Sequence, residues 1–181
     1  MFHLNTEQLI DYWRDRRGAD AIPYRSSIDP THLRNLLPQV FMLGREAPGQ
    51  YQFRLVGGFV GELHGRDLRE TEFMRLWRGE DRTQLQMAIE AIRRRGEPLV
   101  VECEAHTHMD PAMRMQITLA PLIGPSGQPD RFIGLYQPTS PVAELRDHVV
   151  LSLSVNTMCT PGAVATLPRL RLAAAHGRQT A

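Results

Sequence analysis

The sequence predicts an α+β domain in which helices pack on one face of a single antiparallel sheet. Segments of strand length alternate apolar and polar residues, short turns join neighbouring strands, and one long segment repeats apolar residues at helical spacing. The elements follow the order helix, two strands, short helices, one long helix and three strands. Separate runs of strands around a helical segment are typical of α+β domains rather than of parallel folds.

The first helix is expected after Asn5, which can cap it, and before Gly18, which ends it. Leu9, Tyr12 and Trp13 form one apolar stripe on this amphipathic helix. A helix outside the core needs a surface to cover, so these three residues are candidates for a homodimer contact. Packing of the same stripe against its own chain is the alternative, and the sequence does not separate the two.

The first two strands are expected to form an antiparallel pair. One strand covers residues 40–44, and residues 48–50 supply the hairpin connection. In the second strand, Tyr51, Phe53 and Leu55 alternate with polar residues. Because successive side chains of a strand point to opposite faces, these three residues are assigned to the core face.

The segment between the second and third strands is expected to be helical. Residues 59–63 and 72–77 are predicted to form two short helices, and residues 82–95 one long helix that Gly96 closes. The long helix has one apolar stripe, made of Leu85, Ala88, Ile89 and Ile92. This stripe is expected to pack on the sheet.

Three further strands are expected from their alternation. In the strand that starts at Leu99, apolar residues alternate with Glu102, Glu104, His106 and His108. The next strand alternates Met113, Met115, Ile117 and Leu119 with polar residues, and the last covers residues 131–136. The polar residues of the first of these strands are expected on the face away from the core.

These elements divide the chain into three parts. Residues 1–37 form the N-terminal helix and an extended lead-in, residues 38–141 the core, and residues 142–181 a C-terminal extension that is expected to be partly disordered. Within the extension, residues 147–155 fit either a strand or a helix.

Composition excludes several classes of function. All 21 basic residues are arginine, so a Walker A loop, a Schiff-base lysine and a Ser-Lys dyad are excluded. The net charge of +1 offers no basis for nucleic-acid binding, and no apolar run reaches the ~20 residues of a membrane span. No nucleophile elbow, metalloprotease motif or dinucleotide fingerprint occurs. We therefore expect a cytoplasmic protein that is not an enzyme.

A resemblance to a known family rests on several short sequence motifs. They are YW in the first helix, IPYRSSIDP, LLPQVFML, YQFRLVGG, HGRDLRETEFMRLW and APLIG. With the element order, they resemble the PAS fold, and in particular the single-domain PAS-like proteins common in alphaproteobacteria, over residues 5–140. The resemblance implies a five-stranded sheet in the order 2-1-5-4-3 with helices on one face. It also implies a sensory or regulatory protein that binds a small molecule or dimerises.

The resemblance places a pocket between the sheet and the helices. Its candidate lining is Phe53, Leu55, Phe59, Leu63, Phe73, Trp77, Met87, Val101, Cys103, Met115, Ile117 and Leu135. His64 is a weaker candidate, because related proteins usually have an aromatic residue before the glycine that follows. Either these residues enclose a ligand cavity or they simply fill the core, and the sequence leaves both open.

Cofactors and metals are not predicted. A flavin photosensor of the PAS class needs a cysteine on the helix after the glycine-rich turn, and neither Cys103 nor Cys159 lies there. A haem sensor of this class would place a histidine on the long helix, and residues 82–95 contain none. His106 and His108 could chelate a metal at their i, i+2 spacing, but their strand face looks solvent-exposed or dimer-facing.

The leading hypothesis is a non-catalytic sensory or regulatory module of signal transduction. It would bind a small molecule, a protein partner such as a second copy of the chain, or both. Two alternatives stay open at this point. One is a small enzyme that uses the pocket between sheet and helices, and the other is a structural adaptor with a filled core.

Overall fold

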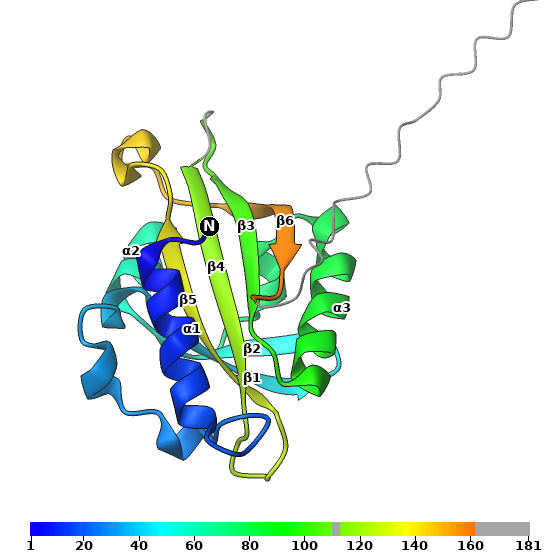
Figure 1. The fold of residues 1–181 in the computed structure, drawn as a ribbon. Coiled ribbons are helices and arrows are strands. Elements are labelled where there is room, and N and C mark those ends of the chain that lie inside the picture. Colours follow the sequence, from blue (N-terminus) through cyan, green and yellow to red (C-terminus); the bar gives the residue numbers. More distant parts are fainter. Residues whose placement is uncertain (110–112, 162–181) are drawn as a thin grey trace, which may run out of the picture.

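The computed structural model describes residues 1–109 and 113–161, which form one sheet covered by helices on both faces (Figure 1). All neighbouring strands pair antiparallel, in the order β2-β1-β5-β4-β3-β6. The strands are β1 Val40–Ala47, β2 Gln50–Val56, β3 Leu99–His106, β4 Met113–Leu122, β5 Arg131–Pro138 and β6 Ser152–Cys159. The first five strands confirm the expected order, 2-1-5-4-3.

A sixth strand corrects the expected number of five. It comes from the segment that fitted either a strand or a helix, and it pairs with β3 along the side that β4 does not occupy. The backbone N–H and C=O groups on that side of β3 would otherwise need water or another partner, and β6 satisfies them. The segment from residue 162 onward, including the end of the predicted C-terminal extension, lies outside the described residues.

Three helices and several 3₁₀ turns complete the fold. The helices are α1 Leu4–Arg17, α2 Gly58–His64 and α3 Gly79–Arg95. The 3₁₀ turns are η1 Arg25–Ser27, η2 Pro30–Leu33, η3 Leu37–Gln39, η4 Phe73–Leu76 and η5 Val142–Leu145. The long helix is confirmed with its apolar stripe, and it ends as predicted at Gly96, whose φ of 66° suits a residue without a side chain.

α1 lies on the opposite face of the sheet from α2 and α3, in front of β4 and β5 in Figure 1. Leu9 and Trp13 are fully buried there, in a cluster that includes Ile133 and Leu135 of β5. The Trp13 indole Nε1–H donates to the Pro121 carbonyl at 2.7 Å. β5 is therefore buried on both faces, which explains why its sequence is nearly all apolar.

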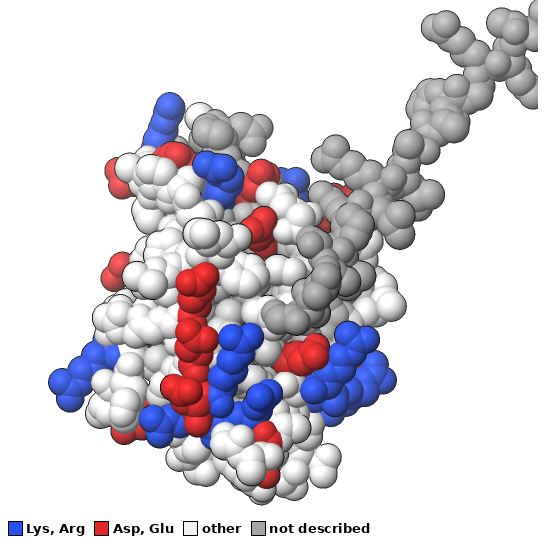
Figure 2. Space-filling view, viewed as in Figure 1, with Lys and Arg blue, Asp and Glu red and all other residues white. Residues whose placement is uncertain are grey.

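The stripe on α1 accordingly packs against its own chain. Leu9 and Trp13 are 0 % exposed and Tyr12 is 9 % exposed, so the dimer contact assigned to them does not match this structure. Packing of the stripe against its own chain, the alternative that the sequence left open, is what the structure shows. The outward surface of α1 carries charges of both signs (Figure 2), among them the Asp11–Arg14 ion pair at 3.3 Å.

The N-terminus of α3 holds the edge of β6. A carboxylate oxygen of Asp81, which is 3 % exposed, accepts a hydrogen bond from the Val155 N–H at 2.9 Å. The Arg78 N–H donates to the Leu153 carbonyl at the same distance. These bonds occupy backbone groups at an edge that would otherwise be free to pair with another chain.

Candidate functional site

The space between the sheet and the helices α2 and α3 is occupied by aromatic rings. The Phe41 ring contacts those of Phe53, Phe73 and Tyr136, with centroids 5.6, 5.8 and 5.4 Å apart. The same ring lies against Gly134 so closely that a Cβ at this position would overlap it. Glycine on β5 therefore makes room for Phe41, and Phe41 fills the middle of the predicted pocket.

Further ring contacts extend this cluster toward α3. Phe73 contacts Phe53 and Trp77, in both cases with centroids 5.7 Å apart. Most of the predicted pocket residues belong to the same buried cluster: Phe53, Leu63, Phe73, Trp77, Val101, Cys103, Met115 and Ile117. Phe59 packs at its rim and is only partly buried. The structure thus brings together the residues expected in the pocket, but they contact one another.

Leu55 is exposed instead of lining the core, because β2 contains a bulge. Met42 pairs with Leu55, but the next residue, Leu43, pairs with Phe53, so Arg54 is left as the extra residue. The bulge reverses the alternation of side chains after Phe53. Leu55 is consequently 43 % exposed, and its assignment to the pocket was wrong.

Met87 and Leu135 are also misplaced by the sequence prediction. Met87 lies two residues after Leu85, about 200° around the helix, and is 68 % exposed. Leu135 packs against α1 on the other face of the sheet. The residue of β5 that enters the predicted pocket is its neighbour Tyr136.

The β5–β6 connection closes the core beside α2. Leu145 and Val150 are buried in the aromatic cluster, and the Val150 N–H donates to the Leu63 carbonyl at 2.8 Å. The prediction missed these two residues because they lie in the C-terminal extension, where no periodic pattern marks them. It also missed Phe41, since β1 is buried on both faces and shows no alternation.

His64 joins α2 to this connection. Its Nδ1 lies 3.1 Å from the Val150 carbonyl, which can only accept, so Nδ1 carries the proton. Its Nε2 lies 3.4 Å from the Tyr136 hydroxyl and is left to accept from it. Burial of the ring lowers the pKa of His64, the Val150 carbonyl opposes this and the positive charge of Arg66 adds to it, so that the pKa is about 4.

We expect the protein to lose stability on acidification between about pH 6.5 and pH 4 because of His64. The unfolded chain binds a proton on this residue below pH ~6.5 and the folded chain does not, so the free energy of unfolding falls as pH falls through this window. At pH 5 the loss amounts to ~2 kcal/mol. Urea unfolding at pH 7.5 and pH 5 measures it.

His64→Phe is the informative variant, and His32→Gln is its control at an exposed histidine. The difference in the free energy of unfolding between pH 7.5 and pH 5 should largely disappear in His64→Phe and should remain in His32→Gln. An equal pH dependence in wild type and His64→Phe would contradict the assignment. The comparison does not go below pH 5, so that carboxylates contribute little.

Cys103 and the remaining histidine candidates contact other groups of the chain. Cys103 is buried on the core face of β3, where burial raises the pKa of its thiol. His106 Nε2 lies 2.7 Å from the Ser154 hydroxyl, and the His108 ring contacts His148 with centroids 4.4 Å apart. In residues 1–109 and 113–161, no three His, Cys, Asp or Glu side chains come together to hold a metal.

Open cavities lie at the surface. One of about 480 Å³ adjoins β2, and another of about 280 Å³ lies between α2 and the β5–β6 connection. A third, of about 400 Å³, lies beside the N-terminus of α1, and a shallow one of about 470 Å³ follows the glycines of α2. Phe53, Phe73 and Trp77 line none of these four.

The sequence profile of the PAS domain family matches residues 1–137. The chain belongs to the PAS domain family. Its sheet order and the helices α2 and α3 on one face agree with this assignment. No curated protein matches the sequence closely enough to count as a relative.

Solved structures similar to this PAS domain include several light-oxygen-voltage proteins. The Rhodobacter sphaeroides LOV protein is 16% identical over 65% of this chain and 72% of its own, with a TM-score of 0.47. The blue-light photoreceptor Aureochrome1 LOV is 12% identical over 60% of this chain and 80% of its own, with a TM-score of 0.46. An RNA-binding light-oxygen-voltage receptor is 18% identical over 70% of this chain and 37% of its own, also at 0.46.

In the described part of this PAS domain, no helix combines the length and the apolar character that a membrane crossing requires.

Proposed function

We propose that this PAS domain is a non-catalytic regulatory module of signal transduction whose core is filled by its own side chains. It recognises its signal, a small molecule or a protein partner, at its surface. The ring cluster of Phe41, Phe53, Phe73 and Trp77 is the observation that carries the proposal. A flavin or haem between the sheet and the helices would have to displace these rings, so neither cofactor is part of the proposal.

The buried polar groups of the core support a structural role over a catalytic one. Both ring nitrogens of His64 have partners, and burial raises the pKa of Tyr136 well above its ordinary value. A general acid or base needs access to a substrate and a pKa near the working pH. These two groups have neither, and we therefore do not propose an enzyme.

The outer face of β3 and β6 is the surface that we propose for a protein partner. α1 covers β4 and β5 and does not extend over these two strands (Figure 1). Their side chains are polar and bond across the strands: Thr157 donates to the Glu102 carboxylate at 3.2 Å, and His106 contacts Ser154. A polar face of this kind suits a reversible partner, which can be a second copy of the chain.

The bound content of the protein, purified from its own host, tests the proposal. We expect denaturation to release no flavin, haem or apolar molecule, and native mass spectrometry to give the 20.5 kDa chain or its multiples. Absorption above 300 nm should likewise be absent. A flavin, a haem or an apolar ligand recovered in stoichiometric amount would refute the filled core.

A further inference from the structure

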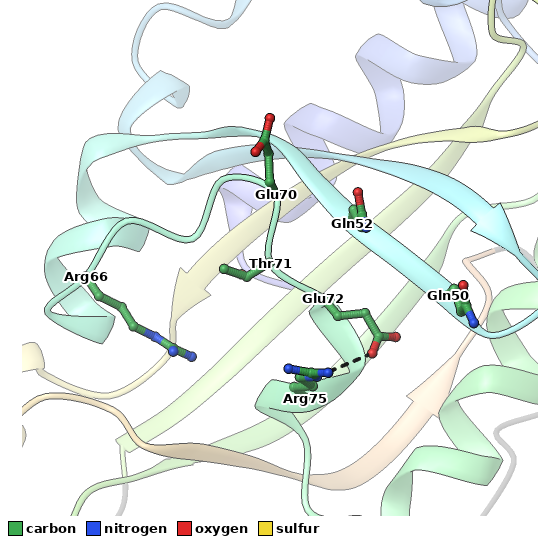
Figure 3. Close-up of a pocket in the computed structure, with 7 residues that line it drawn as sticks. All are labelled: Gln50, Gln52, Arg66, Glu70, Thr71, Glu72 and Arg75. Atoms are coloured by element: carbon green, nitrogen blue, oxygen red, sulfur yellow. Dashed lines mark ion pairs between the residues drawn. The ribbon is translucent and has the colours of Figure 1, made fainter.

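A polar cleft of about 480 Å³ lies outside the core, along the outer edge of β2 (Figure 3). Its wall on one side is β2, and on the other side it is the segment that joins α2 to α3. The residues that line it are Gln50, Gln52, Arg66, Glu70, Thr71, Glu72 and Arg75. None of these belongs to the aromatic cluster, so the cleft does not depend on whether the core is filled.

The backbone of the cleft is fixed by hydrogen bonds. The Phe53 N–H donates to the Thr71 carbonyl at 3.0 Å, and the Glu70 N–H donates to the Phe53 carbonyl at 2.8 Å. Glu70 has a φ of 62°, a conformation that costs energy for a residue with a side chain. The strand edge holds the backbone of this turn in place before any ligand arrives.

Arg66 supplies an uncompensated positive charge. Within the described residues its guanidinium has no hydrogen bond or ion pair, whereas Arg75 pairs with Glu72 at 3.8 Å. Figure 3 shows Arg66 extending toward Arg75, and the Glu70 carboxylate pointing away from both. The positive charge of Arg66 attracts an anion that enters the cleft.

Two side-chain amides complete the set of available groups. Gln50 and Gln52 project from β2, and in the described part of the chain neither amide has a hydrogen-bond partner of its own. Each amide offers two N–H donors and a carbonyl acceptor. The cleft thus combines a forked cation with neutral donors and acceptors, which are the groups that recognise a small polar anion.

We propose that this cleft binds a small carboxylate, which Arg66 holds with Arg75 at its side and whose polar remainder contacts the amides of Gln50 and Gln52. The planar guanidinium matches a carboxylate through two parallel hydrogen bonds. Inorganic phosphate fits less well, because it has no remainder that could contact the amides of Gln50 and Gln52 while Arg66 holds it. The ligand site assigned here goes beyond the proposed function, which names no position for it.

Titration of the full-length protein with succinate at constant ionic strength tests the proposal. NMR of the backbone amides and of the arginine Nε–Hε groups should show saturable shifts at Arg66 and Gln52. The variant Arg66→Gln should bind roughly tenfold to a hundredfold more weakly, the loss expected for a hydrogen-bonded charge. Arg66 is exposed, so the variant is expected to fold, and its amide spectrum checks this.

Arg69→Gln is the matched control. Arg69 is equally exposed and only three residues away, but it pairs with Asp67 at 2.6 Å and does not line the cleft. It should leave the affinity for succinate within about twofold. If both variants lost affinity for succinate equally, the effect would come from general surface charge, and the site would be refuted.

Two other ligands complete the test. Neutral succinamide should produce no saturable shift, because it lacks the charge that Arg66 recognises. Inorganic phosphate should bind more weakly than succinate. Phosphate or succinamide binding as tightly as succinate, or succinate shifts that do not saturate, would overturn the proposal.

Discussion

Replacing Phe41 with alanine is expected to lower the free energy of unfolding by about 3–5 kcal/mol, the usual cost of removing a buried ring. Phe41 is fully buried and contacts three other rings, and it occupies the space above Gly134. The surrounding rings are themselves held by the sheet and by α2 and η4. They cannot collapse completely into the gap, so the variant should contain an apolar cavity.

The same variant should bind a small aromatic molecule that the wild-type core cannot admit. Urea unfolding measures the loss of stability, and a thermal shift with indole measures the new binding. Phe59→Ala is the control, because Phe59 is only partly buried at the rim of the same cluster. Stabilisation of the wild-type protein by indole to the same extent as the Phe41→Ala variant would show that its core already contains a cavity.

The variant Glu90→Gln is expected to lose about 3 kcal/mol of stability at neutral pH. Glu90 ties α3 to β1 and β2: its carboxylate accepts from the Arg45 guanidinium at 2.6 Å and from the Tyr51 hydroxyl at 2.7 Å. Arg93 contacts it as well, at 3.0 Å. Burial alone would raise the pKa of Glu90, but these three donors outweigh it and lower the pKa to about 2.

The sign of the pH dependence follows from this lowered pKa. The contribution of Glu90 is fully present above its unfolded pKa of 4.5 and is lost as pH falls toward 2, because the unfolded chain then binds a proton first. The wild type should therefore lose stability in this acid window and Glu90→Gln should lose much less. Glu62→Gln, at an exposed carboxylate, is the control. Equal stability of Glu90→Gln and wild type at pH 7 would contradict the account.

Much of the fold could be predicted from local patterns. The apolar stripe of Leu85, Ile89 and Ile92 has helical spacing, and the alternation in β3 and β4 marks their core faces. In α3 and β3 one face is buried and the other is more exposed, so apolar residues recur with the period of the element; β4 is buried on both faces but still alternates apolar with polar residues. Together with the short motifs that resemble the PAS fold, they were sufficient to predict the sheet order of the first five strands.

The remaining parts depend on contacts that no local pattern records. The bulge at Arg54 changes the face of Leu55 through its pairing with β1. β6 forms because β3 offers a strand edge and α3 supplies Asp81, neither of which is near it in sequence. α1 covers its own sheet through residues of β4 and β5 that are more than 100 positions away.

The candidate site, too, could be predicted only in part. Eight of the predicted pocket residues lie in the buried cluster, but whether they surround a cavity depends on Phe41 of β1 and on Leu145 and Val150 of the β5–β6 connection, which close the space. The polar cleft escaped prediction altogether. Its residues come from β2 and from an irregular turn, which backbone bonds of Phe53 with Glu70 and Thr71 bring together.

A crystal structure of the wild-type protein under xenon pressure tests the filled core most directly, since xenon occupies apolar cavities that exclude water. The account predicts no xenon site among Phe41, Phe53, Phe73 and Tyr136, and a well-occupied site at that position in crystals of Phe41→Ala. Xenon bound between these rings in the wild-type protein would contradict the filled core and favour a PAS domain that senses a ligand within it.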